Sequence, residues 1–334
     1  MYFGLSEDQI FFQDNVKKFL EDNAPLDAVK KITEGADLST KDELHQGLIN
    51  LGINNILIPE ENGGLGLDLL FASAVSQSLG EGIATLPFVG PYVIAPIAIK
   101  YGASDSQKEK LFNEMSQNLI NCGVGFSEYF GSRDSSDLSI SNNKITGRTL
   151  FVLDVDFASH VMLCDKKGQI GLVSLESKGI EIIDLTTVDK TRTYKEMIFK
   201  DTPIEILDKT KISTEAAEMA LSAGRIVAAA DSLGASQAMI NKAVEYSKER
   251  KQFNRVIGSF QAVKHMCAEM TAELEPCYSL VWHAAHSFDD SHEDSKLMAC
   301  LAKSHTSEVS KMVSKKATEV HGGMGFTDLL GLHF

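Results

Sequence analysis

Arg250 and Gln252 stand in the stretch Tyr246 to Met270, where polar side chains interrupt an otherwise apolar helical pattern. An arginine guanidinium can donate two parallel hydrogen bonds to a phosphate, and a glutamine amide both donates and accepts. Gln261 supplies a second amide shortly afterwards. The spacing alone also fits a solvated basic C-terminus on an ordinary helix, which the helix dipole favours. The stretch therefore indicates either an anion site or a helix end.

Two helical segments on either side of a bend must position these side chains. Apolar residues recur at helical spacing before and after the bend, and Asn254 and Gly258 are residue types that interrupt such a pattern. We predict a helix, a tight bend and a second helix.

The whole stretch, with R-x-Q-F, a bend, I-x-x-F-Q and A-E-M, resembles the acyl-CoA dehydrogenase family. The resemblance implies that Arg250 and Gln252 bind the pyrophosphate of an FAD held by the neighbouring subunit. It also implies that Gln261 lies by the adenine end and that the Phe253 ring packs beside these groups. Asn254 stands where the family usually has Gly, and Asn tolerates a left-handed backbone.

A second motif, HGGMGFT, spans His321 to Thr327, and its paired glycines let a backbone approach a phosphate or a ring closely. An esterase oxyanion loop would also require a G-x-S-x-G nucleophile elbow, which the sequence lacks. The motif is similar to the family's Q-x-x-G-G-x-G-F, which implies that Gly322 and Gly323 touch the FAD pyrophosphate. Glu319 takes the place of the family's Gln, and a carboxylate repels a diphosphate.

The resemblance further implies two contacts to the flavin ring from the middle of the chain. Ser127, in F-S-E, offers a hydroxyl to the pyrimidine edge, and Phe151, in L-F-V-L-D, replaces the family's Trp as an aromatic wall. Leu153 stands where the family has a hydroxyl donor and cannot replace it. Plain strand core remains the alternative for Phe151 and Leu153.

The family's reaction is the α,β-dehydrogenation of an acyl-CoA thioester, in which a carboxylate removes the α-proton and a hydride passes to the flavin. The family places this base either after G-G-x-G-F or immediately before an Arg on the first bundle helix. The second position is Gly224 here, ahead of Arg225, and the first lies beyond Phe334. The catalytic base is therefore unknown. Arg225 is expected to contact the pantetheine of CoA, with a structural ion pair as the alternative.

Three explanations of the missing base stay open: a shortened chain, an atypical acid, or the short subunit of a heteromeric dehydrogenase. We favour the third, because FAD-contacting residues are retained where the base is not. It resembles bacterial two-gene enzymes for bulky acyl-CoAs such as steroid side chains. This implies a heterotetramer with a longer base-bearing partner, and an electron-acceptor protein. A homo-oligomeric dehydrogenase with an unusual base and a catalytically silent scaffold are the other hypotheses.

The composition is that of a globular chain: 334 residues, 43% hydrophobic and 23% charged. A formal charge of −14, without a basic run, argues against nucleic acid as a partner. The N-terminus lacks a leader pattern and the five cysteines form no C-x-x-C pair, so we expect a cytoplasmic protein. The most apolar run, Ala84 to Ile99, is shorter than the ~20 residues of a membrane span.

Local patterns predict individual elements. Ser6 followed by Gln9 is a capping-box pattern that opens a first helix, and apolar or alternating runs predict strands over Lys144 to Leu153 and His160 to Cys164.

Hydrophobic periodicity predicts an α+β fold. A helical domain is expected over residues 1–118, a central antiparallel β domain over 119–208 and an antiparallel helical bundle over 212–334. This order is found in acyl-CoA dehydrogenases. A Rossmann motif is missing because Glu128 occupies its third glycine position, and no metal is expected, because His283 and His286 lack a third ligand at motif spacing.

Overall fold

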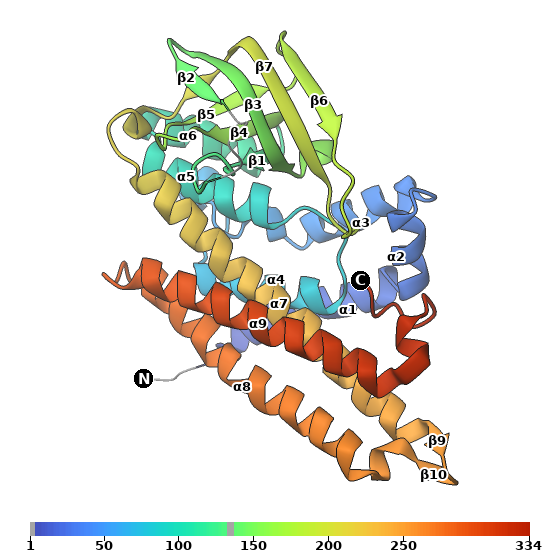
Figure 1. Ribbon diagram of the computed structural model, residues 1–334. Helices are drawn as coiled ribbons and strands as arrows, with labels where there is room; N and C mark the ends of the chain where they lie inside the picture. Colours follow the sequence, from blue (N-terminus) through green and yellow to red (C-terminus); the bar gives the residue numbers. More distant parts are fainter. Residues whose placement is uncertain (1–3, 132–136) are drawn as a thin grey trace. The chain divides into compact units, whose positions relative to one another are not determined.

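The computed structural model describes residues 4–131 and 137–334, and Figure 1 shows N-terminal helices, then a β sheet, then long C-terminal helices. Internal contacts group the chain into two compact units that do not follow chain order. The helical unit comprises Met1–Leu44, Leu69–Ala84 and Arg225–Phe334, and the sheet unit comprises His45–Asp68 and Thr85–Gly224. The domain boundaries given above follow the linear order instead and stay a prediction.

In its described residues the sheet unit contains an eight-stranded sheet, with the order β6-β7-β3-β1-β4-β5-β8 and with β2 beside β3. The strands are β1 (Cys122–Gly125), β2 (Ser139–Ser141), β3 (Lys144–Leu153), β4 (His160–Cys164), β5 (Ile170–Ser174), β6 (Ile180–Asp184), β7 (Tyr194–Pro203) and β8 (Glu205–Ile206). The pairing is antiparallel as predicted, except that β1 and β4 run parallel. Two further strands lie between them in the sequence, which gives the chain the length to return in the same direction.

Alternating apolar residues build the core of this sheet. Ile145, Val161 and Phe199 come from three different strands and are at most 1% exposed. Such branched and aromatic side chains pack well on a pleated surface and favour strands. The strands β3 and β4 have the predicted bounds. The strands β1 and β2 were not predicted, because they are short and rich in Gly or Ser.

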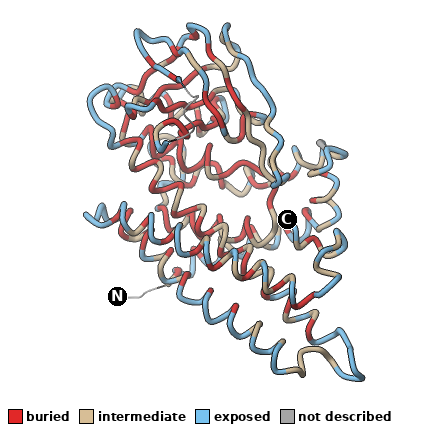
Figure 2. The backbone as a smooth tube through the Cα atoms, viewed as in Figure 1, coloured by how far each residue is buried: buried red, intermediate tan, exposed pale blue. Residues whose placement is uncertain are grey.

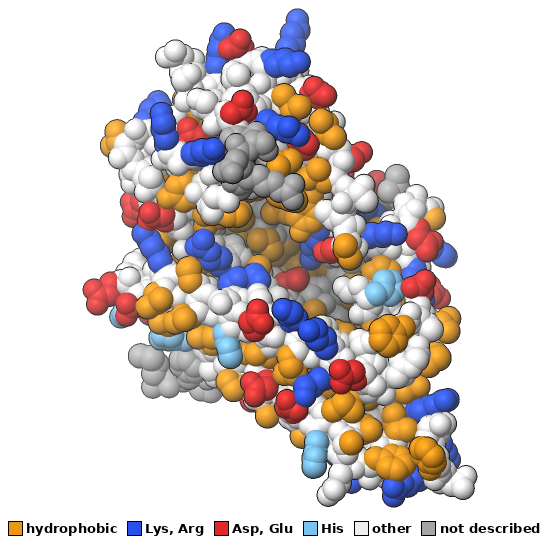
Figure 3. Space-filling model, viewed as in Figure 1, with side chains coloured by type: hydrophobic (Ala, Val, Ile, Leu, Met, Phe, Trp, Pro, Cys, Tyr) orange, Lys and Arg blue, Asp and Glu red, His pale blue; other side chains and the backbone are white. Residues whose placement is uncertain are grey.

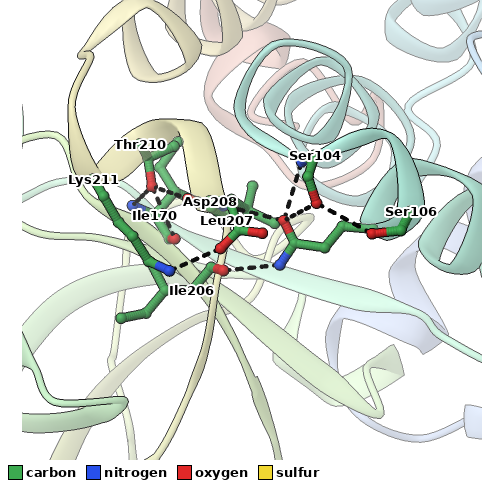
Figure 4. A network of polar contacts seen from close by, with 9 residues as sticks. Ser104, Ser106, Ile170, Ile206, Leu207, Asp208, Thr210 and Lys211 are labelled. Atoms are coloured by element: carbon green, nitrogen blue, oxygen red, sulfur yellow. Dashed lines mark hydrogen bonds and ion pairs between the residues drawn. The ribbon is translucent and has the colours of Figure 1, made fainter.

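A glutamine ties one helix of the sheet unit to the sheet. The helices of this unit include η3 (Val89–Ile94), α5 (Ala95–Gly102) and α6 (Asp105–Ser116), which carries the glutamine. Ser104 and Gln107 form a capping box at the start of α6. The Gln107 amide also donates to the Ile206 carbonyl at 2.9 Å and accepts from the Asp208 N–H at 3.0 Å. Figure 4 labels Ser104, Ile206 and Asp208 within this network of polar contacts. One side chain thus joins the first turn of α6 to β8.

The helical unit is formed around three long helices. Its elements are α1 (Glu7–Asn23), α2 (Leu26–Thr33), part of α3 (Leu38–Asn50), α4 (Leu69–Glu81), most of α7 (Glu215–Glu249), α8 (Gln261–Asp289) and α9 (Ser295–His321). The predicted capping box at Ser6 and Gln9 begins α1. An added Cβ at Gly234 of α7 would lie 1.8 Å from the Gln77 carbonyl oxygen of α4, so these helices pack backbone against backbone.

The surface carries mixed charge. On the face drawn in Figure 3, acidic and basic side chains are interspersed, with hydrophobic side chains between them. Among the described helices, none combines the length and the apolar character that crossing a bilayer requires.

Candidate functional site

The predicted bend is a two-residue β-hairpin. After α7 ends, β9 (Lys251–Gln252) pairs antiparallel with β10 (Arg255–Val256). Phe253 and Asn254 connect them with φ angles of +53° and +60°. Two successive positive φ angles match the right-handed twist of a hairpin, and Asn adopts them at low cost. Asn254 therefore preserves the turn, as predicted from the sequence.

The hairpin presents its polar and aromatic side chains to solvent. Arg250, Gln252 and Gln261 are exposed, and Phe253 is 86% exposed. The hairpin is drawn in the colour of exposed residues in Figure 2. The Phe253 ring meets Phe260 edge-on at 6.1 Å. The Arg255 guanidinium lies over the Phe260 ring at 3.9 Å, a cation–π distance. Arginines and an uncovered aromatic ring at one tip are typical of a surface that another molecule covers.

The structure brings the Arg250 turn close to the glycine motif. The Arg250 N–H donates to the Tyr246 carbonyl at 2.9 Å, which continues the helical pattern of α7 to Arg250. The Tyr246 ring lies against the ring of His321, with the centroids 4.6 Å apart. His321 is the last residue of α9 and directly precedes Gly322. The two motifs are far apart in the sequence, but they adjoin within the helical unit.

The glycine motif follows a buried, hydrogen-bonded histidine, but its own backbone is exposed. His321 is 4% exposed, and its Nδ1 lies 2.7 Å from the Ala317 carbonyl, so Nδ1 carries a proton and donates. Gly322 has φ +58° and starts η7 (Gly322–Phe326). A Cβ added at Gly322 or Gly323 would meet nothing within 4 Å. This exposed backbone is open to a ligand such as a diphosphate, whereas the Glu319 side chain, also exposed, does not favour one.

In the sheet unit, the two predicted flavin contacts differ in burial: Ser127 is buried and Phe151 is exposed. The Ser127 hydroxyl is buried and donates to the Leu150 carbonyl at 2.6 Å, so it can only accept from a further group. The pairing of β3 with β7 shifts register between Thr149 and Val152. Phe151 sits in this bulge with φ +57° and is 42% exposed. A bulky residue held there is strained, and such strain is common where a side chain is re-aimed for binding.

The space beside Gly224, where the family can place a base on α7, is filled by another side chain. An ideal Cβ at Gly224 would lie 3.0 Å from Cδ1 and Cγ1 of Ile94, which comes from η3. A glutamate would therefore displace Ile94. Arg225 is half-buried and makes no ion pair within 4 Å among the described residues, which removes support for the structural alternative.

A buried polar cluster in the sheet unit was not foreseen. Asp154 follows β3 with φ +60° and is 7% exposed, and its carboxylate lies beside Gly90, where an added Cβ would be 3.0 Å from Oδ2. The Tyr92 hydroxyl lies 2.8 Å from Nε2 of His45. Burial, together with the Asp154 charge, raises the pKa of Tyr92 well above its usual value. No motif spacing could have predicted this cluster, because its members come from three distant segments.

Comparisons with known proteins define the family. The family description "Acyl-CoA dehydrogenase, N-terminal domain" matches residues 6–118, and "Acyl-CoA dehydrogenase, C-terminal domain" matches residues 214–333. The chain therefore belongs to the acyl-CoA dehydrogenase family, whose members are FAD-binding flavoprotein oxidoreductases that act on acyl-CoA. The fold is the one expected for this family.

Among curated relatives, acyl-CoA dehydrogenase IpdE2 of Mycolicibacterium smegmatis is 27% identical over 324 residues, covering 97% of this chain and 89% of that protein. The 3-(aryl)acrylate reductase of Clostridium sporogenes is 26% identical over 309 residues, covering 85% and 81%. Among solved structures, the ChsE4-ChsE5 complex from Mycobacterium tuberculosis has a TM-score of 0.85 at 20% identity, covering 98% and 90%. Butyryl-CoA dehydrogenase from Megasphaera elsdenii has a TM-score of 0.86 at 22% identity, covering 100% and 93%.

Proposed function

We propose that this chain is a subunit of an FAD-dependent acyl-CoA dehydrogenase and shares its FAD site with a longer, base-bearing partner in a heterotetramer. The observation that carries the proposal is a contrast along α7. At Gly224, where the family can place a base, the Ile94 side chain occupies the space that a new side chain would enter. Arg250 and the glycine motif, in contrast, are exposed at the surface.

The open surface would hold the nucleotide of a neighbouring subunit. Arg250 binds the pyrophosphate of FAD through charge-assisted hydrogen bonds, and Gln252 supports it. The backbone at Gly322 and Gly323 approaches the same pyrophosphate, because no side chain intervenes. Gln261 lies by the adenine end. Phe253 covers the site from the hairpin tip and shields these hydrogen bonds from water.

The remaining site residues serve the flavin ring and the substrate. Phe151 forms an aromatic wall, and its strained backbone in the bulge supports a binding role. Ser127 contributes its hydroxyl oxygen as an acceptor, because its proton is used by Leu150. Arg225 contacts the pantetheine of the acyl-CoA. FAD supplies the hydride acceptor, and this chain's residues bind and orient it.

The α-proton would be removed by a carboxylate of the partner subunit. Assembly with a partner is supported by relatives in the family that were solved as complexes, such as ChsE4-ChsE5 and a variant of the steroid ACAD Tcur3481-Tcur3483. The description of Tcur3481-Tcur3483 as a steroid ACAD favours a bulky acyl group such as a steroid side chain, in lipid metabolism. An electron-acceptor protein would reoxidise the flavin, and the cytoplasm is the proposed location.

Purification of the complex from its native source tests the proposal. We expect a longer homologous chain to copurify, to be identified by mass, and to bring bound flavin with it. Isolation of this chain only as a flavin-containing homo-oligomer would contradict the heteromeric assignment. Absence of flavin from every preparation would favour the silent scaffold.

A homo-oligomeric dehydrogenase with an atypical base is the second candidate, because Asp154 is a buried carboxylate close behind Phe151 in the sequence. If this candidate holds, the chain alone dehydrogenates an acyl-CoA and Asp154→Asn abolishes the reaction. An active Asp154→Asn variant would exclude Asp154 as the base.

A further inference from the structure

A groove of about 610 Å³ lies on the sheet unit, and none of its lining residues belongs to the proposed flavin or substrate set. Buried Ile120, Leu172 and Ile204 give it an apolar floor. Its volume falls in the range of roughly 300–1,000 Å³ typical of small-molecule pockets, which combine apolar lining with a few polar groups. Its polar lining, from α6, β4, β5, the turn after β5 and β8, includes Lys110, Glu114, His160, Ser174, Ser177 and Glu205.

The walls of this groove are held in place by the network in Figure 4. Gln107 bonds to the backbone at Ile206 and Asp208 and so fixes α6 beside β8. Lys110 follows about one turn later on α6, and its Nζ lies 3.0 Å from Oε2 of Glu205, the residue before Ile206. The two walls therefore meet through a backbone-anchored amide and an ion pair, and a ligand does not have to order them.

Carboxylates outnumber cations around the groove. The Lys110 ammonium pairs with Glu205. Glu114, one turn further along α6, is half-buried and makes no ion pair within 4 Å among the described residues. The formal charge of the whole chain, −14, adds to this negative potential. The rim is thus complementary to a cation.

His160 adds a hydrogen-bond acceptor to the rim. Burial lowers the pKa of His160, and this effect outweighs the Glu114 charge, which acts in the opposite direction. The lowered pKa favours the neutral ring. Its Nδ1 lies 3.0 Å from the hydroxyl oxygen of Ser159. That hydroxyl donates to the Asn121 carbonyl at 3.5 Å and accepts from the Asn121 N–H at 3.2 Å. The Ser159 hydroxyl can donate to Nδ1 or accept from it, so the neutral ring can take the tautomer that leaves the Nε2 lone pair free for a donor.

We propose that this groove is a binding site for an aliphatic amine in its protonated form. The ammonium head lies by the Glu114 carboxylate and donates to Nε2 of His160. The hydrocarbon chain lies on the floor formed by Ile120, Leu172 and Ile204. Each part of the ligand then meets a complementary group: the ammonium meets a carboxylate, its N–H groups meet an acceptor, and the hydrocarbon chain meets apolar side chains. The site is independent of the proposed flavin chemistry.

Binding of three matched probes to the purified full chain tests this proposal. Hexylammonium, hexanol and hexanoate are unbranched six-carbon compounds whose head groups are cationic, neutral and anionic. By isothermal titration calorimetry we expect saturable binding of hexylammonium, weaker binding of hexanol and the weakest binding of hexanoate. Comparable affinities for hexylammonium and hexanoate, or no saturable binding of hexylammonium, would overturn the proposal.

A matched pair of variants locates the site. Glu114→Gln should weaken hexylammonium binding about threefold to fivefold, the range of a partly exposed ion pair, and leave hexanol binding unchanged. Glu109→Gln removes the same charge from an exposed position on α6 that does not line the groove, and it should leave both probes unaffected. Equal losses of hexylammonium affinity in the two variants would mean that only the general negative charge attracts the amine, which contradicts a specific site.

Discussion

The two parts of α7 differ sharply. At Gly224 the helix is closely packed, because the glycine has no side chain and Ile94 occupies the adjacent space. At Arg250 the helix ends in a hairpin whose side chains face solvent, beside a glycine motif whose backbone is also open. One helix thus carries a closed position where the family can place a base and an open surface where the family binds a nucleotide. Under the proposed function, the contrast means that this chain has lost the base and kept the nucleotide contacts.

Gly224→Glu tests the closed end and has the largest expected effect. The new side chain would collide with Ile94 and bury a carboxylate without a partner. We expect the free energy of unfolding in urea to fall by about 3–5 kcal/mol, with no gain of acyl-CoA dehydrogenation. Gly224→Ala, which adds only the Cβ, should cost about 1–3 kcal/mol. A stable Gly224→Glu protein that turned over acyl-CoA would break the comparison.

Arg250→Ala tests the open end. Loss of charge-assisted hydrogen bonds should weaken FAD binding in the assembled complex about tenfold to a hundredfold, measured by flavin fluorescence. The free energy of unfolding should hardly change, because the side chain is exposed. Lys248→Ala removes a neighbouring positive charge that pairs with Glu245 and serves as the control. FAD retention equal in both variants would remove Arg250 from the site.

Asn254 tests the shape of the hairpin. Its φ of +60° suits Asn or Gly and disfavours a β-branched residue. Asn254→Val should lower the free energy of unfolding by about 1–2 kcal/mol, while Asn254→Gly should change it by less than about 0.5 kcal/mol. Urea titration followed by circular dichroism measures both. If the valine variant were as stable as the glycine variant, the left-handed turn would be in doubt.

Thiol labelling compares the interior of the sheet unit with the surface of the bundle. Burial raises the pKa of Cys122 to about 12, and Cys164 is raised well above its usual value. Both stay protonated and unreactive in the folded protein as the pH rises from neutral to moderately alkaline. Exposed Cys300 should react first, because a labelling reagent can reach its sulfur. Mass spectrometry after brief labelling identifies the sites, and early labelling of Cys122 would show that the sheet unit opens.

Local patterns predicted much of this fold. The Ser6 capping box located the start of α1, and alternating apolar residues located β3 and β4, because both signals lie in neighbouring residues. The residues of the bend also predicted a left-handed turn at Asn254. The sequence did not predict the strand β1, whose Gly123 and Gly125 weaken the periodic pattern.

The site was less predictable, because its decisive features depend on distant segments. Resemblance identified the Arg250 and glycine motifs, but only the fold shows that they adjoin through Tyr246 and His321. The sequence shows that Gly224 lacks a carboxylate, but not that Ile94 fills the space. The Asp154 cluster has no spacing signature at all.

Anaerobic titration with acyl-CoA, followed by the flavin absorbance band, tests the central claim most directly. The flavin-loaded complex with the longer partner should bleach when acyl-CoA is added. This chain alone, reconstituted with FAD, should not bleach with any acyl-CoA, because it supplies nucleotide contacts and no base. Bleaching of the reconstituted chain without a partner would contradict the account.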